Sequence, residues 1–173
     1  MREAVSLLIG CGLLAVGQSV ASPDECAATL PTTDALRKQV EARGAFMVCS
    51  DLFADRPVWA CIERRLAAGE RPWFEIWHML RIGAPEGPAE AAGRAAGYAL
   101  KHDPRQVFDF FGTGPCEGLD VKAKLGAQRA VDELRARRAV VAGLTDTGYH
   151  MSRDECLEMI DRAIERVGLR PKN

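Results

Sequence analysis

Apolar side chains recur along this chain at the spacing of α-helices, and no segment shows the alternation of a half-buried β-strand. The first apolar stripe begins near Thr33, and either Thr33 or Asp34 can cap its amino end. The stripe consists of Leu36, Val40, Met47, Val48 and Leu52. Because these positions recur at helical intervals, we expect one helix that turns a single apolar face inward.

Four prolines follow at nearly equal intervals. They are Pro57, Pro72, Pro88 and Pro104. Proline is favoured in the first turn of a helix, where an N–H group would lack an intrahelical partner. Asp55 and Asp103 can cap the helices that begin after them. The prolines therefore predict four short helices, over residues 57–68, 72–82, 88–101 and 104–111.

Two further helices are predicted near the C-terminus. The first runs from about residue 120 to 143. Its neighbouring arginines, interpreted as a solvated face, are Arg135, Arg137 and Arg138. The second begins at Ser152, where Ser152 and Glu155 have the spacing of a capping box, and it ends at Gly168. Its apolar stripe is Cys156, Met159, Ile160, Ala163, Ile164 and Val167.

This rhythm predicts an all-α fold of stacked short antiparallel helices, HEAT-like or α-solenoid in character. A longer helix and a C-terminal amphipathic helix would close the stack. An irregular helical bundle is the alternative. We expect one domain over residues 34–170, preceded by a flexible segment over 22–33. Gly93 and Gly97 share one helix face, which predicts the close approach of a neighbouring helix.

Residues 1–21 differ in character from the rest of the chain. Arg2 precedes an apolar run over residues 5–16, and small residues lead up to Ala21. This order is typical of a cleavable secretory signal peptide, and the run is shorter than the roughly 20 apolar residues that span a bilayer. An uncleaved anchor and lipidation at Cys11 are the alternatives. We therefore expect a periplasmic or secreted protein.

The composition agrees with a folded domain and disfavours some partners. Hydrophobic residues make up 47% of the chain and charged residues 27%, enough for a packed core. Lys and Arg number 23 against 24 Asp and Glu, a formal net charge of -1, so neither nucleic acid nor an anionic membrane is an expected partner. No later segment is long and apolar enough to span a membrane after signal cleavage. The expected partner is another protein or a component of the cell envelope.

Five cysteines remain after the predicted cleavage: Cys26, Cys49, Cys61, Cys116 and Cys156. Such cysteines usually pair in an oxidising compartment, and among five one stays unpaired. We expect one disulfide between Cys49 and Cys61, across the first helical hairpin. We expect the other between Cys116 and Cys156, with Cys26 left over. Some of the five can instead be buried apolar side chains. Zinc and redox sites are disfavoured, because no Cys-x-x-Cys spacing occurs.

The sequence contains no catalytic, cofactor-binding or metal-binding motif, so we predict no catalytic residue, no cofactor and no metal ligand. Glu75 and His78 share a helix face, as in carboxylate-bridged metal sites, but the second such motif is missing. Three tryptophans can line a binding surface, because tryptophan is enriched at binding hot spots. They are Trp59, Trp73 and Trp77. The alternative, which we favour, is that they form the core between adjacent helices.

Three stretches of the chain resemble exported helical proteins of proteobacteria. They are residues 48–51 (Val-Cys-Ser-Asp), 57–80 and 153–157, and the resemblance covers about half of the chain after residue 21. It implies a periplasmic, all-helical, disulfide-bonded fold and transfers no catalytic residue. Some small exported helical proteins of this plan are immunity proteins against secreted cell-wall enzymes, an analogy of size, compartment and class.

These features together predict an exported, non-catalytic helical binding module, for example an inhibitor or immunity-type protein. The alternative is a small periplasmic hydrolase acting on cell-wall or peptide substrates, in which acidic residues or His78 would act. A third hypothesis is a structural or envelope-stress protein without a discrete ligand.

Overall fold

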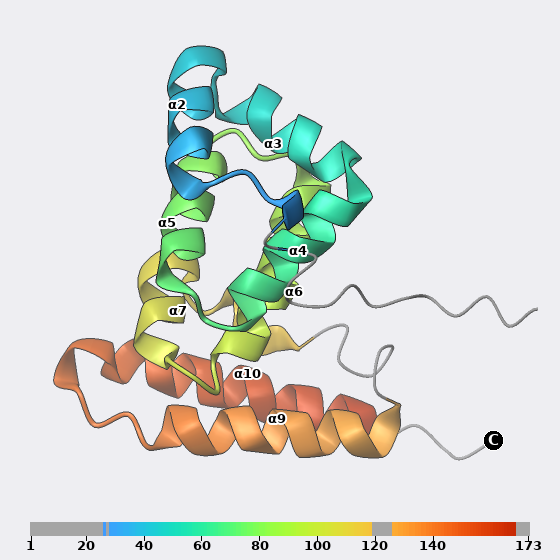
Figure 1. The fold of residues 1–173 in the computed structure, drawn as a ribbon. Coiled ribbons are helices and arrows are strands. Elements are labelled where there is room, and N and C mark those ends of the chain that lie inside the picture. Colours follow the sequence, from blue (N-terminus) through green and yellow to red (C-terminus); the bar gives the residue numbers. More distant parts are fainter. Residues whose placement is uncertain (1–25, 27, 119–125, 169–173) are drawn as a thin grey trace, which may run out of the picture.

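The structure is a computed structural model that describes residues 26, 28–118 and 126–168. Helices joined by short turns build this part of the chain, and it contains no strand (Figure 1). The α-helices are α2 (Thr33–Arg43), α3 (Ala45–Ala54), α4 (Arg56–Ala67), α5 (Arg71–Leu80), α6 (Glu86–Ala99), α7 (Pro104–Phe111), α9 (Ala127–Ala142) and α10 (His150–Gly168). The 3-10 helices are η1 (Gly114–Glu117) and η2 (Thr147–Tyr149). The predicted all-α class is confirmed.

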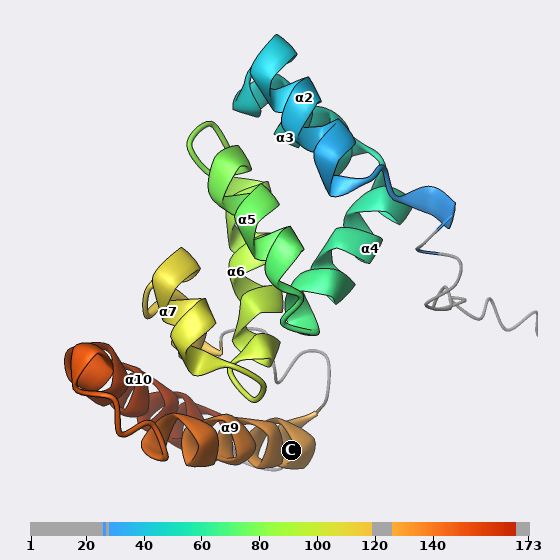
Figure 2. The ribbon, with the colours of Figure 1, turned by 60° about the vertical axis from the view of Figure 1, so that its left-hand side comes forward.

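Helices α2 to α7 stand together, and α9 and α10 lie side by side across the foot of this group (Figures 1 and 2). The α9–α10 pair is antiparallel, because the short connection that contains η2 reverses the chain. η1 lies in contact with both α6 and α10, so it joins the upper group to the lower pair. This arrangement is compatible with a solenoid-like stack and with an irregular bundle.

The regular spacing of the prolines predicts the starts of the helices well. Pro57, Pro72 and Pro104 lie in the first turns of α4, α5 and α7. The carboxylate of Asp55 accepts a hydrogen bond from the amide of Val58, as predicted for a cap, at 3.2 Å. Asp103 caps α7 in the same way, and the observed range of α7 equals the predicted one. α6 begins at Glu86, two residues before Pro88.

The predicted first helix is instead two helices, α2 and α3, which meet at Gly44. This glycine has φ +84°, a conformation that interrupts a helix and that residues with a Cβ rarely adopt. The chain changes direction there, so the single apolar stripe does not persist and Met47 is 49% exposed. The cap is also one residue earlier than predicted, because the hydroxyl of Thr32 accepts the hydrogen bond from the amide of Ala35.

The predicted capping box of the last helix is wrong. α10 begins at His150, so Ser152 lies inside the helix. The preceding turn starts the helix instead: the carboxylate of Asp146 accepts a hydrogen bond from the amide of Gly148 at 2.9 Å, and η2 continues directly into α10. The helix ends at Gly168, as predicted.

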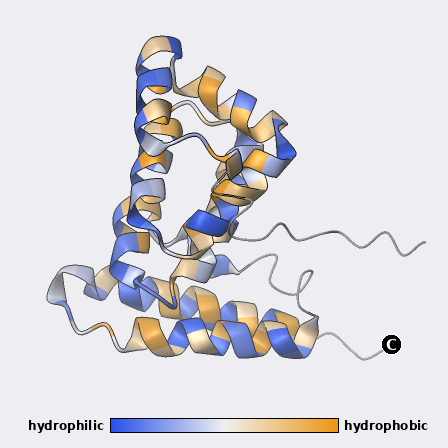
Figure 3. Cartoon of the chain, in the orientation of Figure 1, coloured by the Kyte–Doolittle hydropathy of each residue, from blue (hydrophilic) through white to orange (hydrophobic). Residues whose placement is uncertain are grey.

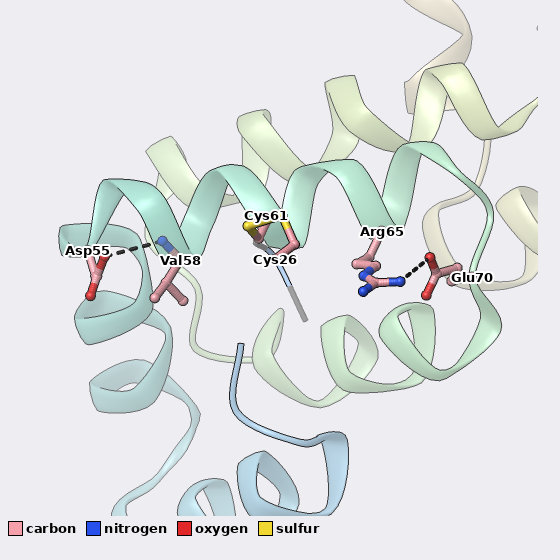
Figure 4. Close-up of a disulfide and its surroundings, with 6 residues drawn as sticks. All are labelled: Cys26, Asp55, Val58, Cys61, Arg65 and Glu70. Carbon is pink, nitrogen blue, oxygen red and sulfur yellow. Dashed lines mark hydrogen bonds and ion pairs between the residues drawn. A yellow bond between two sulfur atoms is a disulfide. The ribbon is translucent and has the colours of Figure 1, made fainter. Parts of the chain in front are cut away.

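Two disulfides cross-link the fold, and only one of them agrees with the prediction. Cys116 pairs with Cys156, which joins η1 to α10 as expected. Cys61, however, pairs with Cys26 and not with Cys49 (Figure 4). Cys26 lies against α4, and its Cα atom is 5.4 Å from that of Cys61.

Cys49 is left unpaired because its side chain faces the interior from α3. It is fully buried, and burial raises the pKa of its thiol to about 11. It therefore behaves as a small apolar side chain, one of the possibilities open for these cysteines. Cys26, predicted to be the unpaired one in a flexible segment, is itself 2% exposed.

The helices carry apolar and polar sides, and the apolar sides build one continuous core (Figure 3). Aromatic rings pack together in the part of the core between α4, α5 and α7. Trp77 stacks on Phe111 at 5.9 Å between ring centroids, and Trp59 meets Trp77 edge-on at 6.4 Å. These contacts link α4, α5 and α7.

Some predictions lie outside the described residues. They are the signal peptide over 1–21, residues 22–25 and 27 of the segment before α2, and residues 120–125 of the longer helix predicted from about residue 120. The start predicted for that helix is wrong: α9 begins at Ala127, because Gly126 before it has φ +75° and interrupts a helix. In the described ranges, no helix combines the length and the apolar character needed to cross a membrane.

Candidate functional site: a cavity around a buried arginine

Arg137 on α9 is the most unusual side chain of the fold. It is 1% exposed, although the sequence predicts that it belongs to a solvated face with Arg135 and Arg138. A signal for its burial was present: Arg137 lies three residues after Leu134 and four before Val141, both fully buried, and this spacing places all three on one helix face. The prediction for Arg137 is therefore wrong, because it considered the charge of the side chain and not its spacing from the buried Leu134 and Val141.

The guanidinium of Arg137 is held by an aromatic ring and a carboxylate. Its central carbon lies 4.3 Å from the centroid of the Tyr98 ring on α6, within cation–π range. Its Nε donates to Oε1 of Glu133 at 3.0 Å. The other oxygen of Glu133 accepts a hydrogen bond from Nζ of Lys101 at 2.8 Å. Glu133 therefore joins two cations that come from α9 and from the end of α6.

Glu133 is ionised in this arrangement. Its burial acts to raise the pKa of the carboxyl, but the hydrogen bonds from Lys101 and Arg137, together with their positive charges, outweigh burial and lower the pKa overall. Two cations and one carboxylate give the group Lys101–Glu133–Arg137 a formal charge of +1. We call this group the charge triad.

One donor of the triad is unsatisfied. Nη2 of Arg137 is buried and has no hydrogen-bond partner within the described part of the chain. A buried donor of this kind costs roughly 1–3 kcal/mol, and more when the group is charged. Such an atom calls for an explanation, and a bound group that accepts its hydrogen bond is one.

A cavity of about 410 Å³ adjoins this side chain. It is lined by Glu90, Gly93, Arg94, Gly114, Pro115, Glu117, Gly118 and Arg137. We call it the Arg137 cavity. Its walls come from α6, η1 and α9, and its volume lies within the range of small-ligand sites.

Glycines keep the Arg137 cavity open and let its walls approach. A Cβ on Gly93 would meet nothing within 4 Å, so this position borders free space. A Cβ on Gly97 would lie 2.8 Å from Nη1 of Arg137 and 2.9 Å from the carbonyl oxygen of Pro115. The close approach predicted at these glycines is therefore found at Gly97, and what approaches is an arginine side chain and the backbone of η1.

The walls of the cavity are fixed covalently and electrostatically. The disulfide between Cys116 and Cys156 attaches η1 to α10 directly beside the lining residues of η1. On α6, Arg94 forms an ion pair with Glu90 at 3.4 Å. This pair is neutral, so the charge triad and the exposed Glu117 decide the net charge at the cavity.

The side chains singled out from the sequence lie elsewhere. Trp59, Trp73 and Trp77 are buried at 3%, 7% and 4% exposure, which is the core position that we favoured over a binding surface. His78 is exposed and lies edge-on to the ring of Phe110.

Its neighbour Glu75 is engaged elsewhere. The carboxylate of Glu75 accepts hydrogen bonds from Arg37 at 2.9 Å and from Arg71 at 3.3 Å. Among the described residues, no group of three or more His, Cys, Asp and Glu side chains could hold a metal ion.

Comparisons of this chain with protein-family models, with curated proteins and with solved structures found no match. The cavity is therefore interpreted from its own geometry.

Proposed function

We propose that this protein is an exported helical binding module that holds a partner from the cell envelope at the Arg137 cavity, without catalysis. The observation that carries the proposal is the buried, unpaired Nη2 of Arg137, a residue that lines a ligand-sized cavity. Folded proteins rarely leave such a donor without a partner, so a site that is completed by a bound group accounts for it.

The two disulfides support the exported location. Disulfides persist in oxidising compartments and are rare in the cytosol. The pairs Cys26–Cys61 and Cys116–Cys156 are compatible with a periplasmic or extracellular protein, in agreement with the signal-like residues 1–21.

The lining of the cavity supports binding over catalysis. The titratable side chains that the described part of the chain contributes to it are two glutamates and two arginines, and Glu90 is already paired with Arg94. Among the described residues of the lining, none is a serine, cysteine or histidine that could act as a nucleophile or a general base. The side chains that remain are suited to hold a charged ligand.

Export is tested on the protein isolated from its native cell. We expect the envelope fraction to contain a chain that has lost residues 1–21 and carries both disulfides, as measured by intact mass spectrometry. A cytosolic chain that keeps Met1 and has every thiol free contradicts the proposal.

Binding is tested by retention of periplasmic proteins and cell-wall fragments on the immobilised, disulfide-intact protein. The matched variants are Gly93→Leu, whose side chain would occupy the cavity, and Ala139→Leu, which adds the same side chain at an exposed position of α9 away from the lining. We expect one component to be retained by the native protein and by Ala139→Leu and to be lost with Gly93→Leu. Equal retention by all three, or none by any, contradicts the proposal, and cleavage of the retained component would favour the hydrolase alternative.

A further inference from the structure

We propose that the Arg137 cavity binds a single carboxylate group, presented by a peptide or by a small carboxylic acid, through Nη2 of Arg137. The inference deepens the proposed function and rests on it. It starts from the geometry of the guanidinium: Nε is used by Glu133 and the ring face by Tyr98, whereas Nη2 has no acceptor among the described residues. The missing partner is therefore a hydrogen-bond acceptor.

The positive charge of the triad favours an anionic ligand. The charge triad has one more cation than anion, because Glu133 is shared between Lys101 and Arg137. Arg137 is fully buried, whereas Lys101 and Glu133 are partly exposed. A buried net charge is unfavourable unless a counter-charge compensates it. One negative charge at Nη2 would make the group neutral, whereas a neutral ligand would leave the imbalance in place.

The surroundings favour one negative charge over two. Glu90 and Glu117 both line the cavity, and Glu133 lies beside it. Glu90 is paired with Arg94, and Glu133 with Lys101 and Arg137, so each already has its counter-charge. A dianionic phosphate would add a second negative charge near these carboxylates and meet repulsion that a carboxylate avoids. The planar carboxylate also matches the planar guanidinium in shape.

The glycines supply the room for such a group. Gly93 borders free space on α6, and Gly114 and Gly118 line the opposite wall. Without side chains at these positions, a ligand can approach the backbone of both walls. The volume of about 410 Å³ leaves space for more than the carboxylate alone, so the group that carries it can also enter.

The test measures binding to the disulfide-intact protein by calorimetry, with matched probes. N-acetylglycine carries a terminal carboxylate, and N-acetylglycinamide is the same molecule without the charge. Blocked aspartate, N-acetyl-aspartate amide, presents a side-chain carboxylate, and inorganic phosphate is the competing anion. We expect N-acetylglycine or blocked aspartate to bind about tenfold or more tightly than the uncharged amide and than phosphate. The better of the two carboxylates tells whether a chain end or an acidic side chain is the natural source.

Two variants connect the binding to the cavity. Arg137→Met removes the unpaired donor and leaves Glu133 paired with Lys101, and we expect carboxylate affinity to fall about tenfold to a hundredfold. Gly93→Leu leaves Arg137 intact and fills the cavity, so it keeps the test decisive if Arg137→Met fails to fold. We expect Gly93→Leu to abolish carboxylate binding and Ala139→Leu to leave it unchanged.

The inference is overturned if the carboxylate and amide probes bind alike, if phosphate binds more tightly than both carboxylates, or if Gly93→Leu retains full affinity. The two proposals can fail separately. An envelope component that is retained through the cavity without any carboxylate preference overturns this inference and leaves the proposed function standing. Carboxylate binding without a retained envelope component overturns the proposed function and leaves this inference standing.

Discussion

Two glycines on the same face of α6 have opposite surroundings. Gly93 borders the open Arg137 cavity, whereas Gly97 lies against Nη1 of Arg137 and the carbonyl oxygen of Pro115. The sequence shows only that the two share a face. Their different roles depend on what packs against each of them, which is a property of the assembled fold.

This contrast predicts opposite effects of the same substitution. Gly93→Ala should raise the free energy of unfolding by up to about 1 kcal/mol, because alanine is the better helix former and the added methyl meets nothing. Gly97→Ala should lower it by about 1–3 kcal/mol, because the methyl would overlap both a side chain and a backbone atom. Urea unfolding of the two variants checks the prediction, and equal effects would contradict it.

Protonation of Glu133 should make the free energy of unfolding fall at acidic pH. Hydrogen bonds and positive charges from Lys101 and Arg137 outweigh burial and lower the pKa of this carboxyl below its ordinary value of 4.5. On acidification, the unfolded chain therefore binds the proton first, so the contribution of Glu133 is present above about pH 4.5 and is lost as the pH falls through the lower, folded-state pKa.

We expect Glu133→Gln to remove this part of the acid sensitivity. The measurement is the free energy of unfolding between neutral pH and pH 3, and the native protein should lose more stability than the variant over the acid range. Glu41→Gln, at an exposed position of α2, serves as the control and should follow the native protein. A parallel decline in Glu133→Gln would show that the carboxylate does not stabilise the fold.

At the scale of elements, local chemistry decides some boundaries and not others. α7 was predicted over its full range, because Asp103, Pro104 and Gly112 are a cap, a first-turn residue and a helix stop that act within the segment itself. The break at Gly44 was missed, since an isolated glycine inside an apolar pattern is also compatible with a continuous helix. Packing of α3 beside α2 and α5 favours the break.

Two substitutions distinguish a true cap from an apparent one. Asp103→Ala removes the acceptor for the amide of Gln106 and should lower the free energy of unfolding by about 0.5–2 kcal/mol. Ser152→Ala changes a residue inside α10 and should have an effect below about 0.5 kcal/mol. A loss at Ser152 as large as that at Asp103 would restore the predicted capping box.

At the scale of the whole molecule, the disulfides connect segments that the helix pattern does not relate. Cys26 and Cys61 are 35 residues apart, and Cys116 and Cys156 are 40 apart. Each bridge closes a long loop, which in the chain-entropy model stabilises the fold by about 4 kcal/mol. The second bridge also fixes η1, and with it one wall of the Arg137 cavity.

The cysteines are tested by peptide mapping without reduction. We expect linked peptides that contain Cys26 with Cys61 and Cys116 with Cys156. Cys49 should be alkylated by iodoacetamide only after unfolding, because it is buried and burial raises the pKa of its thiol to about 11. Rapid alkylation of Cys49 in the native protein, or a linked peptide of Cys49 and Cys61, would contradict the structure.

The sequence by itself determined the features that arise from neighbouring residues. Helical periodicity, capping aspartates and first-turn prolines act over a few residues, so the all-α class and most helix boundaries followed from them. The pairing of Cys116 with Cys156 was also predicted, from the helix layout.

The tertiary structure alone decided the features that depend on which surfaces meet. The burial of Arg137 against α6 and η1, the partner of Cys61 and the space beside Gly93 are set by contacts between segments far apart in the chain. Hydrophobic packing is non-directional, so periodicity shows which face of a helix turns inward but not what that face contacts. The candidate site is made of such contacts, which is why the sequence pointed to a close approach at Gly93 and Gly97 but not to a binding site.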